Sequence, residues 1–350
     1  MADPIQFERR TEVAGFFSPL AGMEFAEDRV EVRTDPLTGM TAIASAGLEA
    51  KEEMFLGRTD WAYTDLLVAR SREGCFFCPE KVQEATPKYP EELVPGGRLT
   101  RGRALVFPNL FPLAQVHAVV TFPEKHFLRP SEFTPSLIEE GLGAGLDFVR
   151  RAAAFYPGLT HLQLSCNHML PGGASLVHPH FQVFGGQTVP WLTQLYWDKS
   201  AAWQAGHGAS YWDQLVAQEQ AAGERYVWGA GGVHWLVPFA PAGAREALAV
   251  APAVSSLTEL DDGHVAALAA GLNRILTWYE DEGLSAFNFT LYGGPLDGRD
   301  AGFPVVLRLI ARTAFKQDYR TDDYFLQKQL GGELMFAAPE EMAAQLRTLF

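Results

Sequence analysis

The order of strand and helix patterns repeats once along this chain of 350 residues. The first half has two strand patterns, a helix pattern and two further strand patterns, at 104–109, 117–122, 131–156, 161–166 and 178–184. The second half begins with the strand patterns YVWGA, HWLVPF and EALAV. A helix pattern and two further strand patterns come after them, at roughly 262–281, 286–292 and 304–311. We therefore predict an internal duplication of about 100 residues per copy, which buries one continuous sheet or two similar ones.

Composition and charge narrow the class of protein. With 47% hydrophobic and 12% aromatic residues, the chain can bury a large core in two domains or in one double-sized unit. A formal net charge of −14 argues against non-specific binding to nucleic acid or to an anionic membrane surface. Neither a signal peptide nor a run of about 20 apolar residues is present, so we expect a cytoplasmic protein.

The segment NHMLPGGASLVHPHFQ, residues 167–182, carries the most informative side chains. In an extended strand alternate side chains share a face, so His178, His180 and Gln182 are expected to point the same way. A pair of histidines alone is also typical of a metal-binding fragment or of an ordinary strand. Gly172 and Gly173 allow a tight loop in which the backbone and Ser175 approach an anion closely. The combination indicates phosphate chemistry on an imidazole.

Two of the three cysteines, Cys75 and Cys78, have the CxxC spacing that is common to zinc sites and redox motifs. The redox reading needs a thioredoxin-like helix start, whereas Pro79 and a polar stretch follow here. The zinc reading needs two further ligands, because structural zinc is nearly always four-coordinate. His126 and His178 are the best placed candidates. Such a site would tie the loop near residue 75 to the strand that carries His180.

The two copies differ at the position of the proposed chemistry. Where the first copy has HPHFQ, the second has VVLRL without a histidine, so only the first carries the reactive group. Residues 186–222 between the copies are expected to form a helical connector that can also cover the site, and 339–349 a closing helix. A nucleotide ligand would need local positive charge, for which the candidates are Arg33, Arg101, Arg103 and Lys125.

Several motifs in order resemble the galactose-1-phosphate uridylyltransferase family of the histidine triad superfamily. They are RTDPLTG (33–39), CFFCP, VFPNLFPL (106–113), VHAVVTFPEKH (116–126), NHMLPGGASLVHPHFQ, VPFAP and GGELMFAAPEEMAAQLR. The resemblance implies an α+β fold with a duplicated histidine-triad-like unit, in which antiparallel sheets are flanked by helices. It also implies an N-terminal domain at 1–185 with the HPHFQ and CxxC motifs, a degenerate C-terminal repeat at 186–350, and a homodimer.

The same resemblance implies a ping-pong nucleotidyl transfer. The second histidine of the HPH motif, His180, would attack the α-phosphorus of a nucleotide sugar, and a sugar phosphate would then take the nucleotide away. Gln182, Ser175 and Asn167 would hold phosphate oxygens, and the Gly172 and Gly173 amides would add donors. The implied structural zinc ligands are Cys75, Cys78, His126 and His178. The implied nucleotide contacts are Arg33 and Asn109 for the phosphates and ribose, and Phe76 and Phe107 for the base.

The chemistry is reasonable on physical grounds. A neutral imidazole is available as a nucleophile near neutral pH, because its unperturbed pKa is about 6.5. If a backbone carbonyl accepts from one ring nitrogen, the other is free to attack. The charge of the transition state spreads over non-bridging oxygens, which Ser175, Gln182 and the glycine amides can stabilise.

Some assignments stay open at the level of the sequence. Asn109 is also compatible with a turn, Ser175 with a loop hydroxyl that is satisfied locally, and Phe76 and Phe107 with the hydrophobic core. The remaining histidines, His117 among them, are expected to be structural or exposed. Many members of the family carry a second metal site where this chain reads LYGGP (291–295) and FPVVLRL (303–309), so we expect no iron or second zinc there. The region that reads the hexose matches only loosely, around 328–333.

Three functions are compatible with these residues. The first is transfer of UMP, or of another nucleoside monophosphate, between a nucleotide sugar and a sugar 1-phosphate. The second is a phosphorylase or hydrolase of ADP-sugars or dinucleoside polyphosphates, with phosphate or water as the acceptor. The third is a nucleotide-binding protein without turnover, against which the retained His180 and Gln182 argue, since a binding module needs no nucleophile.

Overall fold

A single ten-stranded sheet is the centre of the molecule. The structure, a computed structural model, describes residues 4–49 and 51–350. Neighbouring strands in this sheet follow the order β4-β5-β6-β8-β7-β12-β13-β11-β10-β9, and each neighbouring pair is antiparallel. The strands are β4 Leu99–Arg101, β5 Ala104–Pro108, β6 Val116–Thr121, β7 His161–His168, β8 His180–Gly186, β9 Tyr226–Ala230, β10 Val233–Leu236, β11 Ala247–Ala251, β12 Phe287–Tyr292 and β13 Val305–Ala311.

The strand order carries the predicted duplication. Starting from the central pair β7 and β12, the neighbours outward are β8, β6, β5 and β4 on one side and β13, β11, β10 and β9 on the other. Each copy therefore contributes five strands to one continuous sheet. The predicted fold class is confirmed, and of the two predicted arrangements the single sheet is the observed one. The division into domains at residues 185 and 186 stays a prediction, because the two halves share this sheet.

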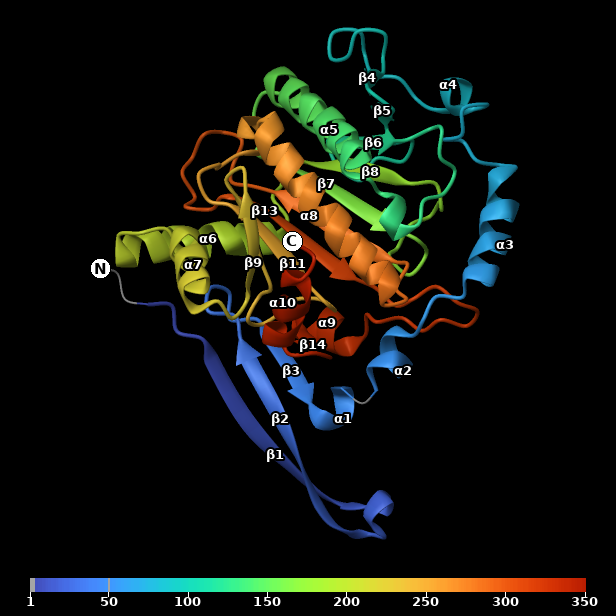
Figure 1. Cartoon of the computed structure of the whole chain (residues 1–350). Helices are drawn as coiled ribbons and strands as arrows, with labels where there is room; N and C mark the ends of the chain where they lie inside the picture. The colour runs from blue at the N-terminus through green and yellow to red at the C-terminus, as the bar shows by residue number, and fades with distance from the viewer. Residues whose placement is uncertain (1–3, 50) are drawn as a thin grey trace.

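Two long helices cover one face of the sheet. Helix α5 (Pro135–Phe155) lies over the strands of the first copy, and helix α8 (Asp262–Asp281) lies beside it over the second (Figure 1). Asp261 caps α8 by accepting from the His264 amide, and a proline opens α5. Alternate residues of β8, Phe181 and Val183, are buried in the core under these helices.

The opposite face is covered only in part. Helices α6 (Trp191–His207) and α7 (Tyr211–Ala222) form the predicted connector. They pack through Tyr196, Trp197 and Trp212 onto strands of the second copy, where Tyr292 and Val306 join the same cluster. The face of the first copy, which carries His180 and Gln182, instead opens into a cavity. The connector thus covers the second copy, not the predicted site.

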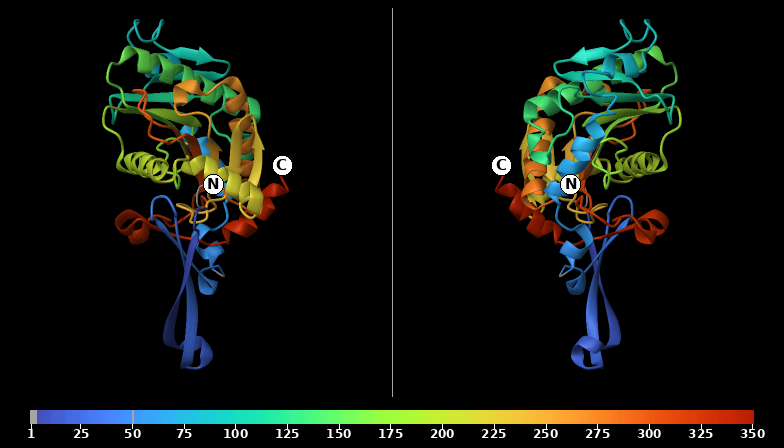
Figure 2. Two further views of the ribbon diagram at one scale, coloured as in Figure 1. Left: turned by 90° about the vertical axis from the view of Figure 1, so that its left-hand side faces the viewer. Right: turned by 90° about the vertical axis from the view of Figure 1, so that its right-hand side faces the viewer.

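A second, four-stranded sheet joins the two ends of the chain. Its order is β1-β2-β3-β14, and β3 pairs in parallel with β14. The strands are β1 Glu8–Ser18, β2 Glu24–Thr34, β3 Thr41–Ser45 and β14 Gly332–Leu334. Strands β1 and β2 extend away from the body as a narrow ribbon (Figures 1 and 2). We call residues 8–34 the arm.

Short helices complete the described chain. They are α1 Ala46–Glu49, α2 Glu52–Leu56, α3 Trp61–Arg72, α4 Val82–Ala85, α9 Phe325–Leu330 and the predicted closing helix α10, Pro339–Arg347. None of the helices in the described ranges combines the length and the apolarity that a membrane crossing requires.

Candidate active site and metal centre

A cavity of about 530 Å³ lies over strands β5, β6, β7 and β8 of the first copy. Its lining brings together most of the residues that the sequence singled out: Phe76, Phe107, Asn109, Asn167, Gly173, Ser175, His180 and Gln182. These residues come from positions as much as 106 apart in the chain. A volume of this order is typical of small-molecule pockets.

His180 is the first residue of β8 and is 92% buried, with its ring at the cavity. Its Nδ1 lies 2.8 Å from the carbonyl oxygen of His178, which fixes the proton on Nδ1 because a carbonyl can only accept. The lone pair of a neutral His180 ring is therefore on Nε2. Burial lowers the pKa of His180, whereas the hydrogen bond to the His178 carbonyl raises it by less. The net lowering of the pKa favours the neutral ring.

Gln182 lies two residues further along β8, and its carboxamide is oriented by His117 on the neighbouring strand β6. The Leu113 amide donates to Nδ1 of His117 over 3.2 Å, so the ring proton is on Nε2. That Nε2 donates to Oε1 of Gln182 over 2.8 Å. With its oxygen occupied, Gln182 has its NH₂ group left to donate to a ligand in the cavity.

Asn167 on β7 is oriented in the same way by the second copy. Nδ2 of Asn288, on β12, donates to Oδ1 of Asn167 over 2.8 Å. The Asn288 oxygen in turn accepts from Arg312 over 2.7 Å, which fixes the orientation of this amide. Asn167 is therefore left with its NH₂ group as the free donor, like Gln182. Neither His117 nor Asn288 was assigned a role from the sequence.

The glycine loop after β7 differs in detail from the expectation. Gly172 packs against the backbone of β7 and β12: a Cβ atom there would come within 2.3 Å of the His168 carbonyl oxygen and 2.9 Å of the Phe287 carbonyl oxygen, so only glycine fits. Gly173 lines the cavity with a φ of 83°, but its amide donates to the Leu170 carbonyl over 2.9 Å. That amide is therefore already used within the turn. Ser175, which is exposed at the cavity, is the remaining side-chain donor of the loop.

Aromatic side chains form part of the lining of the cavity. Phe107 is buried, whereas Phe76 is exposed at the rim. Phe77, which the sequence analysis did not assign, contacts Phe107 and His180 edge-on, with centroid distances of 5.3 and 5.5 Å. Asn109 lines the cavity and also serves as a turn residue, because its Oδ1 accepts from the Phe111 amide. An apolar wall of this kind suits a planar base.

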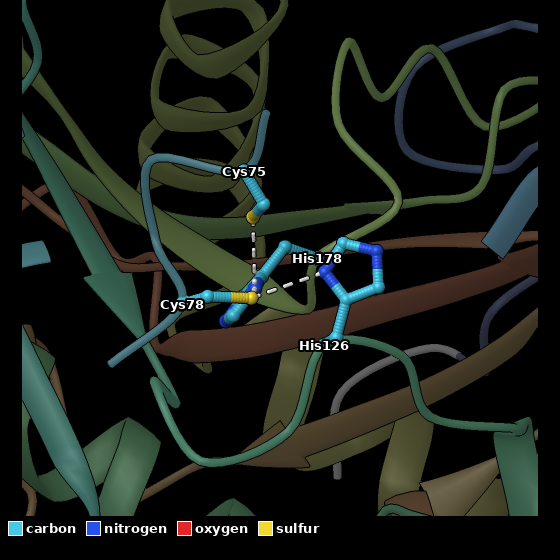
Figure 3. A group of neighbouring side chains, drawn as sticks. All are labelled: Cys75, Cys78, His126 and His178. Atoms are coloured by element: carbon cyan, nitrogen blue, oxygen red, sulfur yellow. Dashed lines mark hydrogen bonds between the residues drawn. The ribbon is translucent and has the colours of Figure 1, made fainter. Parts of the chain in front are cut away.

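The predicted metal ligands lie together, with their side chains pointing toward one another (Figure 3). Ligand atoms of Cys75, Cys78, His126 and His178 all lie within 4.8 Å of one another, and all four residues are buried. Sγ of Cys75 is 3.3 Å from Nδ1 of His178, and Sγ of Cys78 is 3.3 Å from Nδ1 of His126. Tetrahedral zinc, with Zn–S near 2.3 Å and Zn–N near 2.0 Å, separates its ligands by roughly 3.3–3.8 Å.

The chemistry of these four groups fits a metal ion. Burial lowers the pKa of His178 to about 3 and that of His126 as well, which keeps both rings in the neutral, ligating form. Nε2 of His178 donates to the Phe122 carbonyl over 3.1 Å, so Nδ1 faces the cysteines. Burial and the neighbouring Cys75 raise the pKa of the Cys78 thiol to about 12, which disfavours a thiolate in the absence of a positive charge. A bound cation would supply that charge and stabilise the two thiolates. The cluster can therefore hold a metal ion.

The metal cluster and His180 are joined through His178. The sequence predicted that His178, His180 and Gln182 share one face of a strand. The structure begins β8 at His180, and the ring of His178 turns to the cysteines while its carbonyl accepts from His180. A metal ion at the cluster would therefore fix the carbonyl that orients the His180 ring.

Arg33 lies outside this cavity. It is 2% exposed, and its guanidinium donates to Glu31 over 2.6 Å and to both carboxylate oxygens of Glu340 over 2.9 and 3.0 Å. The nucleotide contact that the resemblance implied for Arg33 stays a prediction, and in this chain alone its guanidinium is paired with Glu31 and Glu340. Arg101 and Arg103 are likewise paired, with Asp147 and Glu140. Among the described residues that line the cavity, none is a lysine or an arginine.

The second copy has an ion pair on the strand that corresponds to β8. Arg308 of β13, within the segment FPVVLRL, pairs with the buried Glu246. Arg308 lies in the same cross-strand row as Gln182, through Ser165 and Thr290. The corresponding position of the second copy therefore holds an ion pair.

Comparisons with known proteins place the fold. No family model matches the chain. An uncharacterised protein of Archaeoglobus fulgidus is 27% identical over 348 residues, which are 99% of each chain. Among solved structures, a GalT-like protein from Arabidopsis thaliana has a TM-score of 0.69 and 18% identity, covering 90% of this chain and 98% of that one. An ADP-glucose phosphorylase from the same plant has a TM-score of 0.68 and 19% identity, over 91% and 98%.

A uridylyltransferase has the same fold, with a TM-score of 0.64 and 21% identity over 91% of this chain and 98% of that chain. The predicted resemblance is therefore confirmed for the fold: the chain is folded like the galactose-1-phosphate uridylyltransferase-like proteins along nearly its whole length.

Proposed function

We propose that this protein is a nucleotidyltransferase that passes a nucleoside monophosphate through a covalent intermediate on His180. The observation that carries the proposal is the orientation of two carboxamides that line the same cavity as this ring. The oxygens of Gln182 and Asn167 are occupied by His117 and Asn288, so two NH₂ groups are left to face a ligand beside an imidazole whose proton is on Nδ1. Donors around an unprotonated nitrogen suit an anionic electrophile.

The first half-reaction forms one bond and breaks one. Nε2 of His180 donates its lone pair to the α-phosphorus of a nucleotide sugar. The bond between the α-phosphorus and the bridging oxygen breaks, and that oxygen leaves with the electron pair as part of the sugar 1-phosphate. The positive charge that develops on the ring is stabilised by the hydrogen bond from Nδ1 to the His178 carbonyl. In the second half-reaction a phosphate oxygen of the acceptor displaces Nε2 and regenerates the neutral ring.

The donors at the cavity match the charge that develops. Phosphoryl-type transfer spreads negative charge over non-bridging oxygens, which the NH₂ groups of Gln182 and Asn167 and the hydroxyl of Ser175 can stabilise. Loss of one such donor typically costs about 3 kcal/mol, or roughly a hundredfold in rate. The aromatic wall of Phe76, Phe77 and Phe107 would hold the base, and Asn109 the ribose or phosphates.

The metal in this proposal is zinc, in a structural role. The two thiols and two imidazoles would supply a closed tetrahedral set, which leaves no position for a substrate. Bound zinc would hold the cysteine loop and His178 in place. His178 then presents its carbonyl to the His180 ring.

The transferred group is UMP in the first form of the proposal, with a sugar 1-phosphate as the acceptor. The likeness to an ADP-glucose phosphorylase supports a second form, in which AMP leaves an ADP-sugar and inorganic phosphate accepts it. Both forms use the same covalent intermediate on His180. The two forms differ in which base the pocket binds and in whether a sugar 1-phosphate or inorganic phosphate is the acceptor. A homodimer and a cytoplasmic location remain part of the prediction.

Intact-mass measurement tests the proposal directly. The protein is incubated separately with UDP-glucose, ADP-glucose and GDP-mannose. We expect one UMP-sized or AMP-sized adduct, which identifies the donor. Adding galactose 1-phosphate or inorganic phosphate to the adduct then shows which acceptor discharges it. If none of the three nucleotide sugars leaves an adduct although binding is measurable, the protein is a nucleotide-binding module and the proposal is wrong.

A further inference from the structure

A second cavity lies over the strands of the second copy. It has a volume of about 330 Å³, at the lower end for small-molecule sites. Cross-strand neighbours share a face of a sheet, and Gln182, Thr290 and Arg308 lie in one cross-strand row. The second cavity is therefore on the same face of the sheet as the candidate active site. Leu192 and Thr193, from the first turn of α6, form part of its lining.

The charged side chains of this lining are Arg308 and Glu246. Each carboxylate oxygen of Glu246 already has a donor within the fold: Oε1 accepts from Nη1 of Arg308, and Oε2 accepts from the Ala242 amide over 2.5 Å. Nε of Arg308 is buried, and none of the described residues accepts a hydrogen bond from it. The guanidinium therefore has an N–H group without an acceptor, which is costly for a buried group.

Arg308 also differs from the other largely buried arginines that form ion pairs in the described chain. Five such side chains are exposed by 15% or less. Four of them each pair with two or more carboxylates, namely Arg33, Arg225, Arg245 and Arg312. Arg308 pairs with Glu246 alone. A guanidinium has five N–H donors in a planar fork, so it can hold a second carboxylate.

The rest of the lining favours an organic ligand with an apolar body. Thr193 and Tyr292 carry hydroxyl groups that can donate to a ligand oxygen. The other side of the ligand would meet the apolar residues of the lining, which are Pro190, Leu192, Ala242, Phe289 and Ile310. Because Arg308 and Glu246 are neutral as a pair, the cavity suits a monoanion better than a dianion such as a phosphate ester.

We propose that this cavity binds a small organic carboxylate, whose oxygens accept from the guanidinium of Arg308 and whose apolar body contacts Leu192 and Ile310. A planar carboxylate matches the fork of a guanidinium in a bidentate pair. The site belongs to the second copy and does not depend on the transfer chemistry proposed for His180. The two copies would then each bind an anionic ligand on the same face of one sheet.

Protection of an introduced cysteine tests the site. Leu192 lines the cavity and is 36% exposed, so the thiol of Leu192→Cys should react with iodoacetamide, whereas the three native cysteines are buried. Saturating benzoate or isobutyrate should slow this alkylation by about tenfold or more, because a ligand in the cavity covers the thiol. Benzamide, the neutral isostere of benzoate, should not. Trp191→Cys, at the more exposed neighbour outside the lining, is the matched control, and its alkylation should be unaffected by either carboxylate.

The role of Arg308 is tested in the Leu192→Cys background. Arg308→Lys keeps a cation beside Glu246 but lacks the planar fork, so it should weaken the binding of benzoate by about tenfold. Removing the charge of Arg308 alone would leave Glu246 buried and unpaired. The neutral variant is therefore Arg308→Gln combined with Glu246→Gln, whose folding is checked by thermal unfolding. In this double variant benzoate should give no protection.

Three results would overturn the proposal. They are an alkylation rate that neither benzoate nor isobutyrate changes, equal protection by benzamide, and unchanged protection in Arg308→Lys and in the double variant. Inorganic phosphate and UDP-glucose are assayed in parallel. Protection by either of these without protection by a carboxylate would also overturn the proposal, because the cavity would then be part of a phosphate site.

Discussion

At the scale of single residues, the site depends on side chains that fix the orientation of others. His117 is the clearest case, because its protonated Nε2 holds the oxygen of Gln182 and leaves the amide NH₂ for the ligand. Without it the carboxamide is free to rotate and to present its oxygen to an anion. His117 thus acts through Gln182 as a positioning residue.

His117→Ala should lower the rate of nucleotidyl transfer by about tenfold to a hundredfold, since it weakens one transition-state donor. The loss is expected in kcat more than in KM. His117→Gln, whose amide can donate to Gln182, should recover part of the rate. Single-turnover kinetics with the identified nucleotide sugar measures both variants. Equal rates for His117→Ala and the wild type would show that the orientation of Gln182 does not matter.

Asn288 provides a second residue-scale test, because it belongs to the other copy. Asn288→Ala removes the donor that orients Asn167 and should lower the transfer rate by about tenfold or more. Asn273→Ala, on helix α8 of the same copy, is a control: it removes a hydrogen bond to a backbone carbonyl outside the cavity. An unchanged rate in Asn288→Ala would place Asn167 outside the reaction.

At the scale of elements, the cysteine loop and the start of β8 are held together by the proposed zinc. Elemental analysis of the purified protein should give about one zinc ion per chain, because the four ligands form one closed set. Cys78→Ser should lose the ion and several degrees of thermal stability. Cys166→Ser, at a buried cysteine outside the cluster, should keep the zinc. A wild type without bound metal, or a Cys78→Ser variant that retains it, would contradict the assignment.

The elements also show how far the sequence predicts the site. The HPHFQ segment and the glycine loop are continuous in the chain, so the closeness of His180, Gln182 and Ser175 followed from spacing alone. His117 and Asn288 lie 65 and 121 residues from the side chains that they orient, and only the pairing of strands brings them together. Arg33 is likewise held by a contact that is distant in the sequence, because it pairs with Glu340, 307 residues away.

At the scale of the whole molecule, Glu340 joins the end of the chain to its beginning. It accepts from Arg33 of β2 and from Arg225, both of which are buried. Burial alone would raise the pKa of Glu340, but hydrogen bonds from Arg33 and Arg225 lower it to about 2. A carboxyl whose pKa is lower in the folded state stabilises the fold above its unfolded pKa of about 4.5.

This stabilisation should be lost as the pH falls from about 4.5 toward 2, and it amounts to at most about 3 kcal/mol. Glu340→Gln should therefore lower the free energy of unfolding at pH 7 and have a smaller effect near pH 3. Glu341→Gln, at the exposed neighbour, should have little effect at either pH. Urea unfolding of the three proteins across this range is the measurement. A Glu340→Gln effect that is equally large near pH 3 would contradict the account.

The whole fold was more predictable than the surface of the molecule. The duplicated order of strands and helices could be predicted because each copy must bury the apolar side chains of its own strands and helices. In the structure the two copies form the two halves of one sheet. The two halves are joined by the pairing of β7 with β12, and neither segment has a sequence pattern that indicates this pairing. The sequence therefore could not decide between one sheet and two. The connector at α6 and α7 was expected as helix, but which copy it covers depends on tertiary packing.

The central claim is that His180 carries the nucleotide during turnover, and peptide mapping of the trapped intermediate tests it most directly. The protein is quenched after mixing with the nucleotide sugar that labels it, digested, and sequenced by tandem mass spectrometry. The account predicts one nucleoside monophosphate per chain on His180, and none in a His180→Asn variant that still binds the nucleotide sugar. A label on any other residue, or turnover that persists in His180→Asn, would contradict it.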